Sequence, residues 1–147
     1  MNATENLKAS GSLRVVVTGA DGKVKEEYDF KNLVVTVGKN FVASRMVGTA
    51  SNVMSHMAVG SGTTAAAAGD TTLGSELGRV ALAASTATTN VVTYTATVPA
   101  GTGTGAVTEA GIFNAASAGT MLCRTVFSVV NKGVDDALSV TWTITIS

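Results

Sequence analysis

The chain has 147 residues, with ten Lys and Arg, ten Asp and Glu and one His, so its formal net charge at pH 7 is zero. This length fits one ordinary domain, and the scattered basic residues argue against direct binding of nucleic acid, which requires clustered positive charge. Charged residues make up only 14% of the chain, against a typical share of about 25%. The surface is therefore expected to repel its neighbours weakly and to favour association in an assembly.

The sequence predicts neither a membrane-spanning helix nor a secretory signal. Its apolar stretches fall short of the ~18 to 20 residues that a membrane-spanning helix requires. The polar residues 1–11 lack the apolar segment of a secretory signal. We therefore expect a protein that is made in the cytoplasm, does not enter a membrane, and carries residues 1–11 as a flexible arm.

The first predicted elements are two strands joined by a tight turn. Residues 13–18 and 23–30 flank Gly19-Ala20-Asp21-Gly22, in which the Asp-Gly pair suits a backbone with positive φ. Apolar residues at helical spacing follow and predict one short helix. The helix is expected over residues 38–47, between two further strands at residues 32–37 and 55–59.

Alternation of apolar and hydroxyl side chains marks the second half of the chain. The final segment shows it best, with Ser or Thr between the apolar residues Leu138, Val140, Trp142, Ile144 and Ile146. Such a period of two residues predicts a strand with one face buried in a core. Further strands are expected at residues 79–84, 92–98, 107–113 and 121–130.

Loops rich in small residues separate the later strands, at residues 60–70, 101–105 and 131–136. About eight strands, with turn signals roughly every 8 to 12 residues and one short helix, predict an all-β fold. We expect two packed antiparallel sheets in a jelly-roll-like β-sandwich, which forms a single domain over residues 12–147.

Few residues are suited to a catalytic centre. A nucleophile would need a base within hydrogen-bond reach, and the candidates are Cys123, or a Ser or Thr, acting with the single histidine, His56. Cys123 lies in an apolar strand, where a small buried thiol is the commoner role, and His56 lies in a predicted strand, where packing is commoner than catalysis. We therefore predict no catalytic residues and no enzyme activity, with a hydrolase that uses His56 as a distant alternative.

Cofactor and metal motifs are equally sparse. Gly60-Ser61-Gly62-Thr63-Thr64 follows a predicted strand, as a dinucleotide-binding turn would, but no convincing helix or parallel βαβ unit accompanies it. The pair Asp135-Asp136 lacks the number of oxygen ligands that calcium requires, so a solvated turn is expected there. One Cys and one His do not supply a zinc site. No cofactor and no metal ligand are predicted.

Glu109 shares a predicted strand with apolar neighbours, and two interpretations are open. Its carboxylate could lie on a solvated face of the sheet. Alternatively, Glu109 could form a partly buried ion pair with Arg79 or Arg124 that fixes the register of the strands.

Four runs of the sequence resemble a module of virion structural proteins from tailed bacteriophages. They are Asn32-Leu33-Val34-Val35, Ser55-His56-Met57-Ala58-Val59-Gly60-Ser61-Gly62-Thr63-Thr64, Asp70-Thr71-Thr72-Leu73-Gly74-Ser75-Glu76-Leu77 and Thr108-Glu109-Ala110-Gly111-Ile112-Phe113. The resemblance covers residues 32–147, and similar stretches occur in capsid-associated and tail-fibre-like proteins. It implies a β-sandwich that assembles in several copies on a virion.

The resemblance and the charge-poor composition together favour a non-enzymatic virion protein that is assembled in the bacterial cytoplasm. A capsid cement or decoration protein is the preferred hypothesis, because a small domain with a polar arm suits the stapling of shell subunits. Its partners would be the major capsid protein or other virion proteins, and further copies of itself. The alternative is a tail-fibre or receptor-binding tip that uses the glycine-rich loops, although the low aromatic content offers little surface for stacking on sugars.

Overall fold

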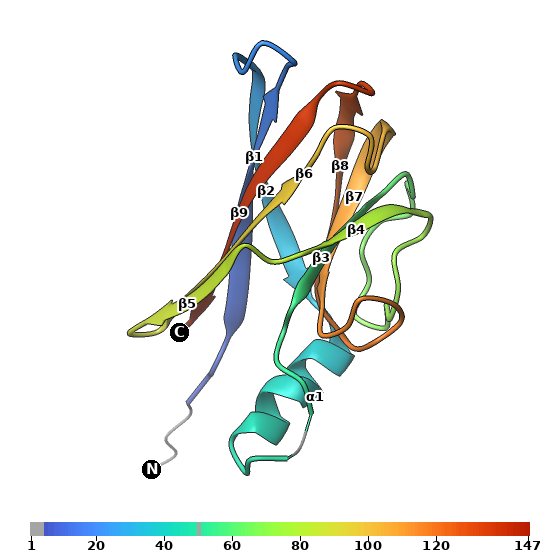
Figure 1. The fold of residues 1–147 in the computed structure, drawn as a ribbon. Helices are drawn as coiled ribbons and strands as arrows, with labels where there is room; N and C mark the ends of the chain where they lie inside the picture. The colour runs from blue at the N-terminus through green and yellow to red at the C-terminus, as the bar shows by residue number, and fades with distance from the viewer. Residues whose placement is uncertain (1–4, 50) are drawn as a thin grey trace.

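The computed structural model describes residues 5–49 and 51–147 and consists mostly of antiparallel β-structure (Figure 1). The elements in chain order are β1 (Ala9–Thr18), β2 (Val24–Val34), α1 (Thr36–Arg45), β3 (His56–Gly60), β4 (Glu76–Ala81), β5 (Ala84–Thr88), β6 (Val91–Val98), β7 (Gly105–Phe113), β8 (Met121–Lys132) and β9 (Ala137–Ile146). The predicted all-β class with one short helix is confirmed. No helix among the described residues is long and apolar enough to cross a membrane.

The nine strands of the described chain form one hydrogen-bonded sheet in the order β4-β3-β7-β8-β2-β1-β9-β6-β5. Strand β2 joins two parts of this sheet. It pairs with β1 as far as Asn32, and then only Leu33 and Val34 pair with β8. The sheet curls at this narrow junction (Figure 1). The five-strand part (β2-β1-β9-β6-β5) and the four-strand part (β4-β3-β7-β8) are therefore continuous with each other.

One hydrophobic core is shared by the two parts of the sheet. The five-strand part contributes Leu13 and Trp142, and the four-strand part contributes Met57, Ile112 and Cys123. Each of these side chains is at most 1% exposed. The core therefore brings together residues from near the two ends of the chain, such as Leu13 and Trp142.

The alternation predicted for the last strand is confirmed in β9, the middle strand of the five-strand part. Trp142 faces the core, and its hydroxyl-bearing neighbours face outward. On this outer face Ser12 pairs with Thr143, Thr143 with Thr93, and Thr93 with Thr86. A row of uncharged hydroxyl groups thus crosses β1, β9, β6 and β5 on the outer face of the five-strand part.

Two boundaries differ from the sequence predictions at the front of the chain. The predicted separate strand over residues 32–37 is wrong, because these residues end β2 and begin α1. Strand β2 continues past Phe30, since Lys31 and Asn32 still pair with β1. Strand β1 begins at Ala9, so it includes residues 9–11 of the segment assigned to the arm.

The predicted short helix is confirmed as α1, which lies against β8 at one end of the molecule (Figure 1). Gly38 permits this close approach, because a Cβ atom there would lie 2.1 Å from the carbonyl oxygen of Leu122. Phe41 packs against the core on the same side of the helix. Val42 and Met46 remain exposed on another face of the helix or just beyond its end.

Candidate functional site

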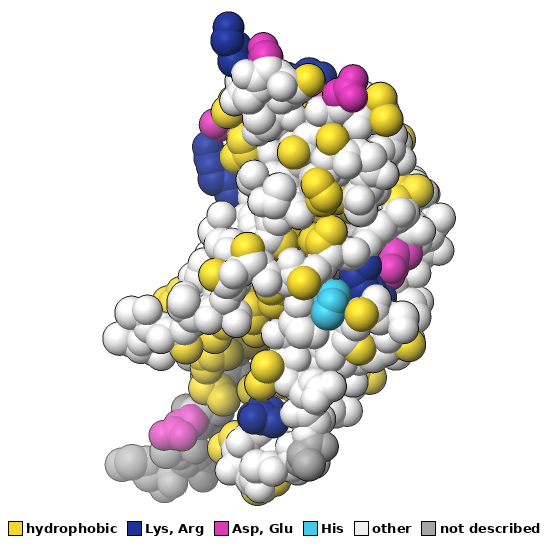
Figure 2. Space-filling view, in the orientation of Figure 1, with side chains coloured by type: hydrophobic (Ala, Val, Ile, Leu, Met, Phe, Trp, Pro, Cys, Tyr) yellow, Lys and Arg dark blue, Asp and Glu magenta, His cyan; other side chains and the backbone are white. Residues whose placement is uncertain are grey.

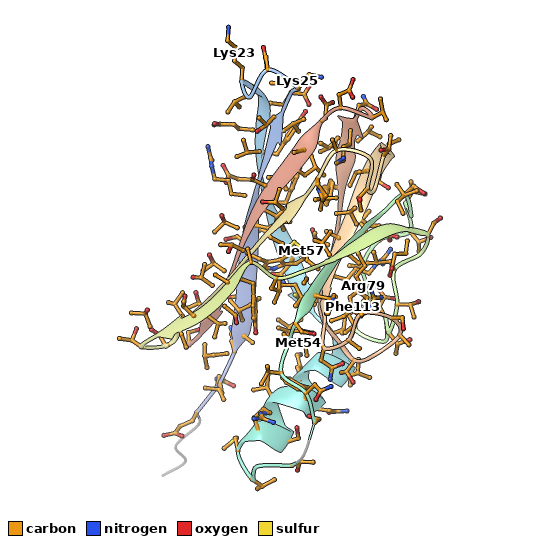
Figure 3. The ribbon with its side chains drawn as sticks, viewed as in Figure 1. Lys23, Lys25, Met54, Met57, Arg79 and Phe113 are labelled. Carbon is orange, nitrogen blue, oxygen red and sulfur yellow. The ribbon has the colours of Figure 1, made fainter. Side chains whose placement is uncertain are left out.

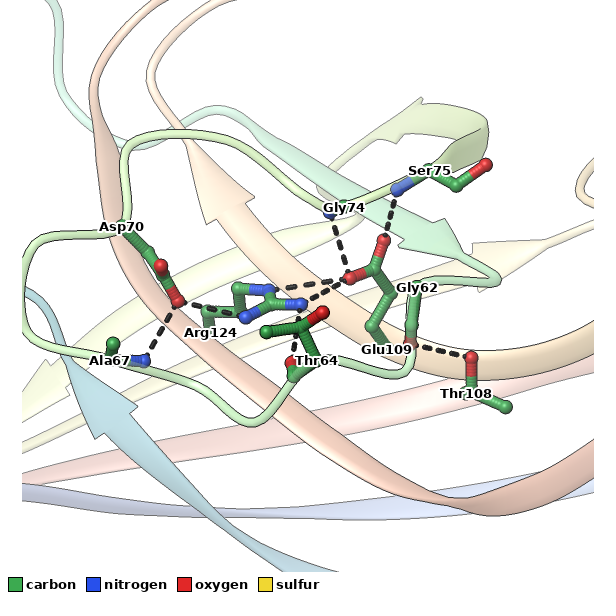
Figure 4. Close-up of polar contacts among 9 residues, drawn as sticks. All are labelled: Gly62, Thr64, Ala67, Asp70, Gly74, Ser75, Thr108, Glu109 and Arg124. Atoms are coloured by element: carbon green, nitrogen blue, oxygen red, sulfur yellow. Dashed lines mark hydrogen bonds and ion pairs between the residues drawn. The ribbon is translucent and has the colours of Figure 1, made fainter.

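The most deeply buried ion pair lies beneath the loop that joins β3 to β4 (Figure 4). Glu109 of β7 is 0% exposed and Arg124 of β8 is 2% exposed. Arg124 Nη2 donates a hydrogen bond to Glu109 Oε2 over 2.7 Å, and Nη1 donates to Asp70 Oδ2 over 2.8 Å. The predicted pairing of Glu109 with Arg124 is confirmed, and the solvated face is wrong for this residue.

This ion pair also fixes the loop above it. The backbone N–H groups of Gly74 and Ser75 donate to the Glu109 carboxylate over 2.9 and 2.8 Å. Arg124 Nη2 donates to the carbonyl oxygen of Thr64 over 3.0 Å. A Cβ atom at Gly60 or Gly62 would lie 2.5 Å from an oxygen of the same carboxylate. The glycines that resemble a nucleotide-binding turn therefore make room for Glu109.

The charges in this cluster satisfy one another. Burial alone would raise the pKa of Glu109, but the N–H group of Ser75, the Arg124 guanidinium and the N–H group of Gly74 together hold it below its ordinary value. The N–H group of Ala67 lowers the pKa of Asp70, burial opposes this effect, and Arg124 lowers it further. Both carboxylates are therefore ionised at neutral pH and engaged with Arg124, which is typical of a structural clamp.

Arg79 of β4 has a different role from the one considered in the sequence. Its guanidinium pairs with Glu76 over 2.7 Å and lies 3.9 Å from the centre of the Phe113 ring (Figure 3). It also donates to the carbonyl oxygens of Ala115 and Ala118. Arg79 thus holds the turn between β7 and β8, and Glu109 is not its partner.

The two candidates for nucleophilic catalysis do not meet. Cys123 lies on β8 and His56 on β3, with β7 between them. The Cys123 thiol is fully buried, and this burial raises its pKa to about 12. His56 Nδ1 lies 2.8 Å from Ser55 Oγ, and no carboxylate contacts this imidazole among the residues that the structure describes. The geometry therefore provides a local Ser-His contact without a third group to orient it.

The turn between β8 and β9 is more buried than the sequence predicts. Asp136 is 6% exposed, accepts a hydrogen bond from the N–H group of Gly133 over 2.8 Å, and pairs with Lys25 over 3.1 Å. The neighbouring Lys132 is also buried and donates to the carbonyl oxygen of Pro99. The expected solvated turn is thus wrong for Asp136. Within residues 5–49 and 51–147, no three His, Cys, Asp or Glu residues lie together as a metal site would require.

An apolar groove of about 620 Å³ lies between α1 and the start of β1. Figure 2 shows hydrophobic side chains exposed in the hollow beside the helix. The lining residues come from both ends of the chain and from the helix: Leu7, Lys8, Ala9, Ser10, Val34, Lys39, Val42, Ala43, Met46 and Ile146. Large hydrophobic side chains at its rim are unusually open to solvent, since Leu7 is 79% and Met46 is 83% exposed. Such an exposed apolar patch is typical of an interaction site.

Lysines supply the charge of this groove. Lys8 stands on the strand side and Lys39 on the helix side, and no acidic residue lines the groove. Neither ammonium group has an ion-pair partner in the described part of the chain. The groove thus combines an apolar floor with two unpaired positive charges, and it suits an apolar segment that carries carboxylates.

The groove lies where the first residues of β1 have β9 on one side but no β2 partner on the other. Strand β1 pairs with β9 from Ala9 onward, but its pairing with β2 begins only at Gly11. Lys8 exchanges two backbone hydrogen bonds with Ser147 at the end of β9. Because successive residues of a strand direct their backbone groups to opposite sides, the N–H and C=O groups of Ala9 point toward the groove.

Comparisons with known proteins found no match for this chain among protein-family models, curated proteins or solved structures. Any function must therefore be argued from its own residues.

The groove has no signature in the sequence as a whole. Its residues are separated by more than a hundred positions, from Leu7 to Ile146. A local signal is present only around α1, where Lys39, Val42, Ala43 and Met46 occupy positions i, i+3, i+4 and i+7. This spacing indicates a second stripe on the helix, but not the strand that lies opposite it.

Proposed function

We propose that the chain is a non-enzymatic structural protein that binds a neighbouring protein subunit through the apolar groove beside α1. The exposure of Leu7 and Met46 at the rim of this groove is the observation that carries the proposal. Burial of such side chains stabilises association by roughly 25 cal/mol per Å² of apolar surface removed from water.

The occupant is inferred to be an apolar segment of a partner protein that carries carboxylates. Lys8 and Lys39 would face these carboxylates across the rim, and charge complementarity of this kind sets the orientation and specificity of binding. A nucleic-acid strand is disfavoured, because two lysines do not make the extended basic surface that phosphate binding uses.

The particle that best suits such a protein is a bacteriophage virion, with the chain as a capsid cement or decoration protein. Three features support this assignment: the runs that resemble virion proteins, the charge-poor composition, and the uncharged hydroxyl row on the outer face. Many copies on one shell would multiply individually weak contacts.

A tail-fibre or receptor-binding tip is the alternative position in the virion. Trp142, the only tryptophan, is fully buried and offers no surface for stacking on a sugar ring. The loop over residues 61–75 is fastened internally through Glu109 and Arg124. Both observations favour the shell over the receptor-binding tip.

The test measures the heat resistance of virions from a phage that carries or lacks this gene. Virions without the chain are expected to release DNA at a lower temperature, and added purified protein is expected to restore the original temperature. The Met46→Glu variant should not restore it, because a carboxylate would enter the apolar groove. Val24→Glu is the matched control, since Val24 is also exposed but lies outside the groove.

Virions that resist heat equally well with and without the chain would contradict the cement role. Immunogold labelling of the same virions separates the two positions. Label on the shell supports the cement role, and label on the tail supports the fibre alternative. Equal restoration by the Met46→Glu and wild-type proteins would show that another surface binds the virion.

A further inference from the structure

The two outermost strands of the sheet differ in how their free edges are protected. Strand β4 ends one side of the sheet and β5 ends the other. An unpaired strand edge is a template for pairing with another chain, and proteins normally block it with charges, prolines, bulges or covering loops.

Strand β4 is blocked in several of these ways. Glu76 and Arg79 place an ion pair on it, and its pairing with β3 is interrupted by a register shift after Val59. The loop at residues 102–103 packs against the face of this strand, because a Cβ atom at Gly78 would lie 2.9 Å from the backbone nitrogen of Gly103.

Within residues 5–49 and 51–147, no charge, proline, bulge or covering loop protects the free edge of strand β5. Its sequence is Ala-Ser-Thr-Ala-Thr, without charge or proline, and all five residues are exposed. Its pairing with β6 is regular along its whole length. Figure 1 shows β5 extending away from the body of the molecule.

We propose that β5 pairs with β5 of a second copy of this chain, as an antiparallel edge-to-edge contact that joins two sheets. A second copy is the partner that fits, because the free N–H and C=O groups of this edge can pair with their own kind and no charged side chain of β5 would face a like charge across the contact. A closed two-fold arrangement of this kind is the commonest symmetry of homo-oligomers. This surface is separate from the groove and does not depend on the function proposed for it.

The pairing brings the middle residue of β5 opposite itself. In β5 (Ala84–Thr88) this residue is Thr86, and the two-fold axis would pass beside it. Facing Cα atoms in antiparallel strands are about 4.5 to 5.5 Å apart, which is within the range for a disulfide. A contact of five residues a side is small, so the dimer is expected to be weak in solution and to strengthen where copies are held together.

Cross-linking of single-cysteine variants tests the geometry. Under mild oxidation, Thr86→Cys is expected to form a disulfide-linked dimer. Thr141→Cys, at an exposed position in the middle of the outer face, is expected to remain monomeric. The native Cys123 is fully buried and should give no background. Equal cross-linking of the two variants, or none at Thr86→Cys, would overturn the proposal.

Sedimentation of charge variants tests the same contact without oxidation. Thr86→Lys places two like charges opposite each other and is expected to weaken the dimer about fivefold or more. Thr86→Glu should do the same, and an equimolar mixture of the two variants should restore association as a heterodimer. Thr141→Lys and the groove variant Met46→Glu are expected to dimerise like the wild type. A wild type that stays monomeric up to its solubility limit, or variants that associate alone as well as mixed, would refute the pairing.

Discussion

Arg124 is the residue on which the buried cluster beneath the β3–β4 loop depends. Its guanidinium contacts Glu109, Asp70 and the carbonyl oxygen of Thr64. Removing it would leave the Glu109 carboxylate, which is 0% exposed, without its cation. A buried charge that loses its partner is far more costly than an exposed one.

The Arg124→Met variant is therefore expected to lower the free energy of unfolding by about 3 to 5 kcal/mol at pH 7. Urea-induced unfolding measures this change. Arg14→Met is the matched control, because Arg14 pairs with Glu27 and Asp29 on the exposed face, and such surface pairs contribute only about 0 to 1 kcal/mol. A similar loss in both variants would contradict a special role for the buried cluster.

The pH dependence of the free energy of unfolding, compared between the wild type and Arg124→Met, distinguishes the loss of charge from the loss of packing. In the wild type, Glu109 and Asp70 have lowered pKa values in the folded state. Their contribution to stability is complete above the unfolded carboxyl pKa of about 4 and is lost as the pH falls through the folded values. In Arg124→Met the unpaired, buried Glu109 should have a raised pKa. The free energy of unfolding of this variant should therefore increase as the pH is lowered from neutral to about 4. The free energy of unfolding of the wild type should stay constant over the same range.

Residue types alone left two interpretations of Glu109 open, a solvated face or an ion pair with Arg79 or Arg124, and gave no indication of the rest of the cluster. An isolated acid among apolar strand residues needs a cation when it is buried, and few arginines were available. The contacts from Gly74, Ser75 and Asp70 come from an irregular loop. Such a loop has no periodic pattern from which its path could be predicted.

At the scale of elements, the packing of α1 on β8 depends on Gly38. The Gly38→Ala substitution adds only a methyl group, but that carbon would lie 2.1 Å from the carbonyl oxygen of Leu122. Alanine favours an isolated helix by about 1 kcal/mol over glycine. The clash is expected to outweigh this gain, because the close-packed backbones of α1 and β8 cannot move apart without losing contacts.

Gly38→Ala is thus expected to lower the free energy of unfolding by about 1 to 3 kcal/mol. Thermal unfolding followed by circular dichroism measures the loss. Asn40→Ala, on the exposed side of the same helix, is the control and should be neutral or stabilising. A stabilised Gly38→Ala variant would mean that α1 is free to move away from β8.

The predictability of each element followed from its side-chain pattern. Strand β9 was predicted because large apolar residues alternate with hydroxyl residues along its length. Strand β5 was missed, because its Ala, Ser and Thr residues bury no large side chain and so produce no alternation. The strand predicted over residues 32–37 was wrong, because β2 continues through Asn32 by pairing with β1, a contact that no local pattern indicates.

At the scale of the whole molecule, the two parts of the sheet are joined by few backbone pairs but share one core. Only Leu33 and Val34 of β2 pair with β8 in the sheet, and the Thr125 hydroxyl of β8 also donates to the carbonyl oxygen of Lys31. Trp142 belongs to the five-strand part and Cys123 to the four-strand part, and both are 0% exposed in the same core. Because separating the parts would expose this core, they are expected to unfold together.

Two probes test this cooperativity in one urea titration. Fluorescence reports the exposure of Trp142, and alkylation reports the exposure of Cys123, whose pKa is raised to about 12 by burial. The two transitions are expected to coincide, as in two-state unfolding. Rapid alkylation of Cys123 at a urea concentration that leaves Trp142 buried would instead show that the sheet opens at the junction.

The sequence by itself determined the class of the fold, because a two-residue period depends only on the geometry of an extended backbone. It also determined the charge-poor composition, whereas the burial of Glu109 and its pairing with Arg124 were decided by the tertiary structure. The tertiary structure decided the order of the strands, the groove beside α1 and the contrast between the free edges of β4 and β5. These features arise where distant residues meet, as Leu13 meets Trp142. Such pairings follow from packing across the whole chain, and the local spacing of residues does not predict them.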